Sequence, residues 1–256
     1  MADSGETVRY FVINLDRSPD RLGTSTKRLA AIGVPFERVA AVDGRSLGPG
    51  PWPEVDSPTF RRNAGRGFSA NEIACNLSHI KALKQFLATR AEYAVVLEDD
   101  FVLPPGRDFG DLINALATRP REWDIAKLYG NRPCAPVHKR HLVGKYTLAA
   151  PLLKYTGAVA YMVNRHGASE IVRMATPITL GFDHYLDQPW IYRAVKYRVV
   201  LPRPVDTDTS FKSSIGYPDS KKYLPIFRIP ALIHRMRVGL ARLFYNARHG
   251  FFLLPQ

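Results

Sequence analysis

The chain has 256 residues, 46% of them hydrophobic and 23% charged, which is enough apolar material for a large core in one α/β unit. Its formal net charge is +13, but the last 36 residues contain seven Lys or Arg and no acid. Because the positive charge is concentrated in a tail and is not spread with aromatic residues over the body, we do not expect a nucleic-acid partner.

No apolar run approaches the ~20 residues that a transmembrane helix needs. The N-terminal segment MADSGETVRY lacks the basic and apolar regions of a secretory signal. Cys75 and Cys134 stand outside any CxxC or Cys/His cluster, which disfavours a zinc site. We therefore expect a cytoplasmic protein with reduced thiols.

The first part of the chain is predicted to alternate strands with helices. Residues 9–15 have the β-branched and aromatic density of a buried strand, and residues 18–32 have the pattern of a helix. A second strand, 37–42, ends in an Asp-Gly turn. The Gly- and Pro-rich residues 45–66 are expected to form an irregular surface excursion.

Ser69 and Glu72 have the spacing of a capping box, which predicts a helix running to about residue 90. On this helix Glu72, Asn76 and His79 share one face. The later elements are predicted, in chain order, as a strand at 93–97, a helix at 108–118, strands at 123–129 and 155–163, a helix capped by Asn164, a polar stretch at 181–188, a short helix after Pro189 and a strand at 196–201. This alternation predicts a three-layer α/β domain with a mostly parallel sheet over residues 1–210.

Three consecutive acids, Glu98, Asp99 and Asp100, follow the strand at 93–97 directly. Ligands of open α/β sheets gather beyond the carboxyl ends of the strands. Two like charges ~4 Å apart repel by about 4 kcal/mol at an effective dielectric constant of ~20. The crowding therefore favours a bound cation, Mg²⁺ or Mn²⁺, that could also hold a diphosphate. The alternative is a solvated turn in which one acid caps the next helix.

Five stretches, in this order, resemble glycosyltransferase family 25, the lipooligosaccharide and collagen sugar transferases. They are Phe11–Arg21 (FVINLDRSPDR), Val39–Gly44 (VAAVDG), Asn71–His79 (NEIACNLSH), Leu97–Asp100 (LEDD) and Thr156–Tyr161 (TGAVAY). The resemblance extends from about residue 8 to 210. It implies a GT-A-type fold, a UDP-sugar donor (commonly UDP-galactose), a divalent metal and inversion at the anomeric carbon.

The resemblance also implies roles for individual residues. Asp100 and Glu98, at the two ends of a DxD-like register, are expected to bind Mn²⁺ or Mg²⁺. The residues expected to bind the donor are Asn14, Leu15, Arg17, Arg21, Asp43, His79, Glu98, Asp99, Thr156 and Gly157.

Inverting transfer needs a base that takes the proton of the acceptor hydroxyl. Asp183 and Asp187, four residues apart in GFDHYLD, are the candidates, with Asp183 preferred. The alternatives are that Asp187 caps the helix after Pro189 and that Asp183 lies on a loop without a catalytic role.

The tail, residues 211–256, contains a predicted basic amphipathic helix. Its apolar positions are Ile229, Ile233, Met236, Leu240 and Leu243, and Arg228, Arg235 and Arg242 form a row seven residues apart. This pattern is typical of a helix that lies on an anionic membrane surface. The alternative is a helix that packs on the body and exposes a basic edge.

We therefore expect an inverting transferase at the cytoplasmic face of the membrane, which extends a lipooligosaccharide or another surface glycan on a glycan or lipid-linked acceptor. Asn71 and Ala74 stand where the family usually has glycines. This departure leaves open a relative that binds nucleotide sugars, or scaffolds partners, without turnover.

Overall fold

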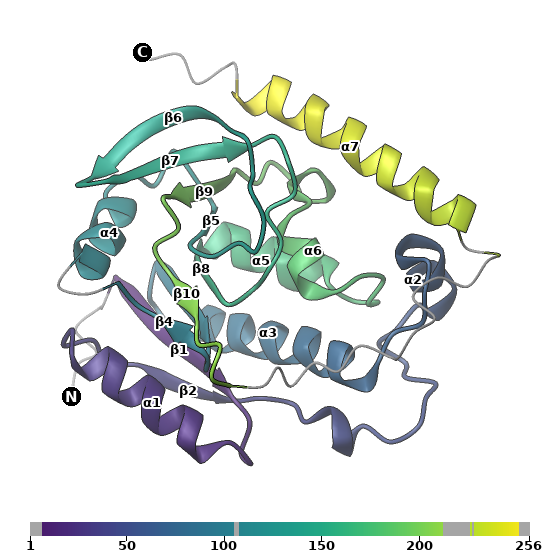
Figure 1. The fold of residues 1–256 in the computed structure, drawn as a ribbon, viewed down its shortest axis with the longest axis horizontal. Helices are drawn as coiled ribbons and strands as arrows, with labels where there is room; N and C mark the ends of the chain where they lie inside the picture. Colours follow the sequence, from purple (N-terminus) through teal and green to yellow (C-terminus); the bar gives the residue numbers. More distant parts are fainter. Residues whose placement is uncertain (1–6, 105–107, 212–225, 227, 251–256) are drawn as a thin grey trace.

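The structure is a computed structural model that describes residues 7–104, 108–211, 226 and 228–250. Its centre is an eight-stranded sheet (Figure 1) with the order β2-β1-β3-β8-β5-β9-β7-β6. The strands are β1 (Val8–Asn14), β2 (Glu37–Ala40), β3 (Tyr93–Glu98), β5 (Ile125–Lys127), β6 (Pro136–Val143), β7 (Tyr146–Pro151), β8 (Ala160–Asn164) and β9 (Tyr197–Leu201). Only β8 and β7 run against the other six strands of this sheet.

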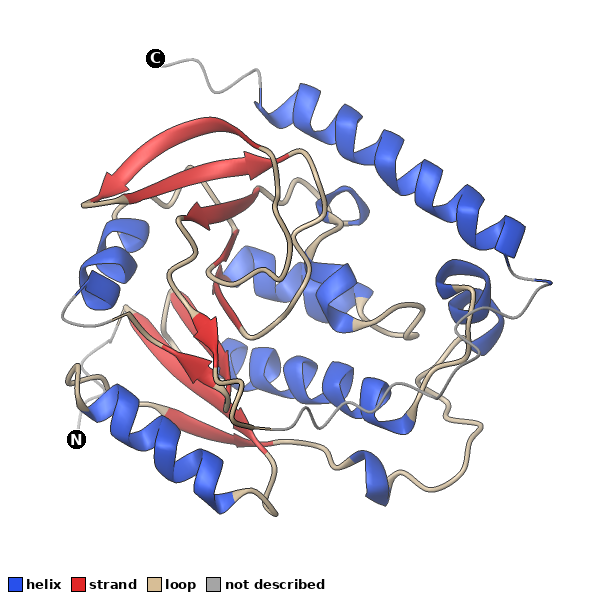
Figure 2. Ribbon diagram, viewed as in Figure 1, coloured by secondary structure: helices blue, strands red, loops and turns tan. Residues whose placement is uncertain are grey.

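Helices cover both faces of the sheet, as the colouring by secondary structure shows (Figure 2). They are α1 (Pro19–Ala30), α2 (Ser57–Ala64), α3 (Ala70–Ala88), α4 (Asp108–Ala117), α5 (Arg165–Met174), α6 (Phe182–Leu186) and α7 (Arg228–Gly250), with short 3₁₀ turns at Gly44–Ser46 and Pro189–Ile191. One core cluster joins the sheet to α3 and α5, and a second joins its other face to α1 and α4. The predicted three-layer α/β fold with a mostly parallel sheet is confirmed.

Strand β3 shows why this sheet is buried on both faces. Ala94 and Val96 pack towards α3 and α5, whereas Val95 and Leu97 pack towards α1 and α4. All four side chains are fully buried. A strand between two helical layers needs apolar residues at successive positions, and this is the pattern of the sequence around it.

The acids at the end of β3 are fixed by a small second sheet. β4 (Phe101–Val102) pairs antiparallel with β10 (Asp206–Thr207). The backbone N–H of Asp208 donates to the carbonyl of Asp100 over 2.8 Å. Arg28 of α1 forms an ion pair with Asp208 and donates to the Phe101 carbonyl. Residues more than 100 positions apart therefore fix the turn that carries the acids.

Three parts of the fold differ from the sequence prediction. The excursion at 45–66 contains α2, which Asp56 caps through the N–H of Thr59, and Phe60 of α2 is buried. β6 and β7 form a hairpin that was not predicted, because β6 (PVHKRHLV) is a partly exposed edge strand with no apolar alternation. The strand expected at 155–163 begins only at Ala160.

Helix α7 runs along the outside of the molecule, past α2 (Figure 1). One face packs on the body, where Arg242 forms a buried ion pair of 2.6 Å with Asp187. Tyr245 donates to the Val195 carbonyl and accepts from the Tyr197 N–H. Of the row predicted on this helix, Arg228 and Arg235 are exposed, whereas Arg242 is buried. No helix among the described residues has both the length and the apolar character to cross a membrane.

Candidate active site

Three adjoining cavities form a groove where β1, β2 and β3 end. The strand-end cavity, about 120 Å³, lies between these strand ends and α3. The central cavity, about 250 Å³, shares Glu98 and Asp100 with it. The basic chamber, about 420 Å³, shares Asp183 with the central cavity. The groove therefore starts at the carboxyl ends of the strands, where the acids were predicted to form a site.

The three acids point to different partners. The register of β1 and β3 pairs Ile13 with Glu98, so Asn14 lies beside Asp99 and donates to its carboxylate over 2.7 Å. Arg21 of α1 approaches Asp99 at 3.1 Å and Asp100 at 3.2 Å. Asp99 is 6% exposed and faces α1, whereas Glu98 and Asp100 both border the central cavity.

Asp100 has the properties of an incomplete cation site. Burial and the nearby Glu98 charge raise its pKa to about 7 despite the Arg21 guanidinium. Its buried Oδ1 accepts no hydrogen bond from any described residue. A carboxylate with an unpaired buried oxygen, next to a second carboxylate, matches the hard oxygen ligands of Mg²⁺ and Mn²⁺. Glu98 and Asp100 therefore fit a divalent cation.

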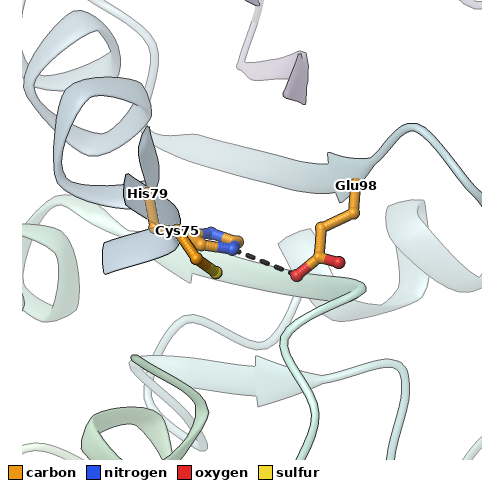
Figure 3. Close-up of side chains that lie close together, drawn as sticks. All are labelled: Cys75, His79 and Glu98. Carbon is orange, nitrogen blue, oxygen red and sulfur yellow. Dashed lines mark hydrogen bonds and ion pairs between the residues drawn. The ribbon is translucent and has the colours of Figure 1, made fainter. Parts of the chain in front are cut away.

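His79 fixes Glu98 from the side of α3 (Figure 3). The ring is 1% exposed and stacks on Phe182 with centroids 4.2 Å apart. Nε2 lies 3.2 Å from Glu98 Oε1, and Nδ1 lies 3.2 Å from the Tyr161 hydroxyl. In the tautomer that carries its hydrogen on Nε2, the ring donates to the Glu98 carboxylate and Nδ1 accepts from the Tyr161 hydroxyl. His79 thus positions Glu98.

Cys75 lies one helical turn before His79, and its sulfur joins the ligand atoms of His79 and Glu98 within 4.8 Å of one another (Figure 3). Burial, with the charges of Glu98 and Asp183, raises the pKa of the Cys75 thiol well above its ordinary value. Mg²⁺ and Mn²⁺ prefer oxygen ligands to sulfur. The two carboxylates therefore suit such a cation better than Cys75, which lines the wall of the cavity.

Asp183 stands across the central cavity from the acids of β3. It lies in α6, and its Oδ2 accepts from the N–H of Gly157 over 3.2 Å. Gly157 has φ +103°, and a Cβ there would lie 2.6 Å from the Tyr129 ring. The buried amine of Lys127 donates to the Gly157 carbonyl. The Gly157 backbone is thus held on both sides, and it fixes the Asp183 carboxylate towards the cavity.

Most residues predicted to bind a donor do line the groove. Those that border the strand-end cavity are Leu15, Arg17, Arg21, His79, Glu98 and Asp99. Gly157 borders the central cavity, and Thr156 borders the basic chamber, where its hydroxyl donates to Asn131 Oδ1 over 2.8 Å.

The side chains of Asn14 and Asp43 bind other residues of the chain. The Asn14 amide donates to Asp99 and to the Ser18 carbonyl, and its oxygen accepts from Arg38, so it lies behind the groove. Asp43 lies beside the groove, where the Arg45 N–H and the Arg17 guanidinium hold its pKa below the usual range. Neither lines the three cavities, and a role of either residue in donor binding stays a prediction.

Asp187 is also a correction to the sequence prediction. It is 1% exposed and lines none of the three cavities. Its carboxylate binds Arg242 and accepts from the Tyr155 N–H over 3.0 Å. These contacts leave no route to a substrate, so Asp187 is a structural anchor for α7.

Sequence reasoning missed Lys127 and the cations of the basic chamber. Lys127 is fully buried, and desolvation lowers its pKa to about 8 against the opposing charge of Asp183. A lysine inside the predicted strand at 123–129 is a signal that could have identified it, because an unpaired charge is rarely buried. The chamber combines residues of α2, residues of the loop that precedes α6, and residues of α7. No local sequence pattern connects these segments.

The profile of Glycosyltransferase family 25 (LPS biosynthesis protein) matches residues 8–186. A Glycosyltransferase 25 family member of Aedes aegypti is 24% identical over 196 residues, which cover 71% of this chain and 32% of that protein. Procollagen galactosyltransferase 1-B of Xenopus laevis is 26% identical over 184 residues, which cover 69% of this chain and 30% of that protein. The chain thus matches about a third of the length of these relatives.

Among solved structures, the mannose-1-phosphate geranyltransferase from Thermus thermophilus aligns with a TM-score of 0.41 and 15% identity. The alignment covers 78% of this chain and 76% of that one. Similarity at this level supports no conclusion about function.

Proposed function

Because the chain belongs to glycosyltransferase family 25, we propose that it is an inverting transferase that moves a hexose from a UDP-sugar to a hydroxyl of a glycan acceptor. Galactose is the proposed sugar, since two relatives are procollagen galactosyltransferases. A lipooligosaccharide or another surface glycan is the proposed acceptor, because the family description names LPS biosynthesis. The observation that carries the proposal is that Glu98, Asp100 and Asp183 border one cavity.

The strand-end cavity suits the nucleotide diphosphate. Arg17 and Arg21 border it at the exit of β1, where their guanidinium groups can contact phosphate oxygens. Glu98 and Asp100 would hold Mn²⁺ or Mg²⁺. When bound, this ion would neutralise charge on the leaving diphosphate. His79 keeps the Glu98 carboxylate turned towards the cavity through the 3.2 Å contact.

Asp183 is the proposed base. It borders both the central cavity and the basic chamber, so it stands between the proposed donor position and the space left for an acceptor. Its Oδ2 is fixed by the Gly157 N–H. The carboxylate would take the proton of the acceptor hydroxyl while that oxygen forms its bond to the anomeric carbon and the sugar–phosphate bond breaks.

We also propose that α7 holds the enzyme on an anionic membrane surface, at the cytoplasmic face. The large apolar side chains on its outer side are 43–74% exposed; they are Ile229, Leu232, Ile233, Met236, Leu240, Leu243 and Phe244. They fall within an arc of about 120° at 100° per residue. Arg228, Arg237 and Arg248 are exposed beside this apolar face. Apolar area with flanking cations is the combination that binds anionic lipid surfaces.

The reaction is tested by UDP release from a panel of UDP-sugars, with Mn²⁺ and with EDTA, in the absence of acceptor. We expect slow hydrolysis of one UDP-sugar that needs Mn²⁺ and falls about 10²-fold or more in the Asp100→Asn variant. Binding of a UDP-sugar without release, in the presence of both Mn²⁺ and candidate glycans, would instead indicate a nucleotide-sugar-binding protein without turnover.

A further inference from the structure

The basic chamber is the largest of the three cavities in the groove, and it has an unusual charge. Its basic side chains come from five separate segments and are Arg66, Arg132, Lys154, His184, His234 and Arg235. The acids that border it are Glu72 and Asp183. Bases therefore outnumber acids three to one in a concave site.

The acids neutralise only part of this charge. Glu72 is engaged by Arg66 through both carboxylate oxygens, at 2.5 and 2.8 Å. Asp183 lies at the border with the central cavity and accepts from Gly157. Lys154 is half-buried, and neither it nor Arg132 has a hydrogen bond or ion pair with any described residue. Among the described residues, Lys154 and Arg132 thus border the chamber without an ion-pair partner.

The cations of the chamber are close enough to influence one another. Desolvation lowers the pKa of Lys154, and the charges of Arg235 and Arg132 lower it further, whereas Asp187 opposes the change. Burial and the charge of Lys154 likewise lower the pKa of His234. An anion placed among these groups would relieve both the repulsion and the desolvation.

We propose that the basic chamber binds an anionic substituent, a phosphate or a carboxylate, carried by the acceptor glycan. Phosphate and carboxylate oxygens accept charge-assisted hydrogen bonds from Lys and Arg, which suits the half-buried Lys154 and the exposed Arg132. An acceptor held there by its anionic group presents its hydroxyls to Asp183, which borders the same cavity. This inference rests on the proposed transfer reaction, and it adds the chemical class of the acceptor.

Helix α7 connects this site to the proposed membrane contact. His234 and Arg235 line the chamber, whereas their neighbours Ile233 and Met236 are exposed on the outer side of the helix. Arg235 is exposed and borders the chamber, whereas Arg242, seven residues on, is buried against Asp187. A lipid-linked glycan with an anionic substituent would therefore lie close to the chamber when its lipid is in the membrane.

The test is calorimetric titration of the full chain with glucose 6-phosphate, inorganic phosphate and glucose, with saturating UDP and Mn²⁺ present so that the strand-end cavity is blocked. We expect glucose 6-phosphate to bind at least about tenfold more tightly than glucose. Lys154→Gln and, separately, His234→Gln should each weaken phosphate binding about fivefold or more at an unchanged melting temperature. The control is Lys84→Gln, which removes an exposed charge on α3 outside the chamber.

Equal affinity for glucose and glucose 6-phosphate would overturn the inference. So would phosphate binding that survives both variants, or the absence of phosphate binding at millimolar concentration. UDP binding by the wild-type chain is measured separately. If UDP fails to bind while phosphate binding remains sensitive to Lys154→Gln, the proposed transfer reaction is wrong and the anion site stands. If UDP binds and phosphate does not, the anion site is wrong and the proposed transfer reaction stands.

Discussion

Asp183 and Asp187 lie four residues apart in one short segment, yet the fold gives them opposite roles. Asp183 borders two cavities, and Asp187 is buried against Arg242. We expect Asp183→Asn to lower turnover by about 10²–10⁴-fold with little change in melting temperature, because it removes the proposed base. We expect Asp187→Asn to lower the free energy of unfolding by about 3–5 kcal/mol, because it leaves a buried Arg242 charge unpaired.

Kinetics and thermal melts on the two variants give the comparison, and each variant serves as the control of the other. Loss of turnover in Asp187→Asn at full stability, or unfolding of Asp183→Asn, would contradict the assignment.

Asp100 makes stability depend on pH in the metal-free protein. Its pKa rises from 3.8 to about 7 on folding, so the folded chain keeps a proton that the unfolded chain has lost. The stabilisation is fully present below pH ~4 and is lost as the pH rises through about 7. At 1.36 kcal/mol per pKa unit, the charged form destabilises the fold by up to ~4 kcal/mol at pH 8.

The Asp100→Asn variant should therefore melt at a higher temperature than the wild type at pH 8 in EDTA, and at nearly the same temperature at pH 4. Calorimetric scans at the two pH values measure the difference. A variant that is less stable than the wild type at pH 8 would show that the ion pair with Arg21 outweighs the burial of Asp100.

At the scale of elements, the local patterns predicted most of the sheet and its covering helices. The capping box of α3 forms as Ser69 and Glu72 predict, and Asn164 caps α5. Such signals depend on residues three or four positions apart, so the sequence carries them directly. The burial of Arg242 was not predictable, because its partner Asp187 lies 55 positions away and only the tertiary fold brings them together.

The site residues follow the same rule. The acids of β3 were found because a strand pattern ends directly before them. Asn14 and Asp43 were expected to contact a ligand, and in the structure their polar atoms bind other residues of the chain. In the first case that partner is Asp99, 85 positions away. A polar residue at a strand end gives the same sequence pattern whether its side chain binds a ligand or another residue of the protein.

The outer face of α7 also gives a prediction at this scale. Leu240 and Phe244 are 54% and 74% exposed. Replacing both with Gln should remove roughly 2–3 kcal/mol of membrane burial and lower binding to phosphatidylserine vesicles about 30-fold or more. Vesicle co-sedimentation measures the effect, with neutral phosphatidylcholine vesicles and raised salt as controls for the arginines. Unchanged binding of the double variant would place the membrane contact elsewhere.

At the scale of the whole molecule, acidic and basic side chains occupy different parts of one groove. Acids lie at the end of β3, cations lie in the basic chamber, and Asp183 stands between them. The residues that line this groove extend from residue 13 to residue 235, and α7 contributes His234 and Arg235 to the basic chamber. The arrangement suits two substrates that meet at the central cavity, a nucleotide donor at the strand ends and an acceptor in the chamber.

The measurement that tests this account most directly is calorimetric binding of UDP to the wild-type chain and to Asp100→Asn, each with Mn²⁺ and with EDTA. We predict that the wild type binds UDP at least about tenfold more tightly with Mn²⁺, and that Asp100→Asn loses this dependence. UDP affinity that is the same with Mn²⁺ and with EDTA, or absent in both, would contradict the role of Glu98 and Asp100 as a cation site for a nucleotide donor.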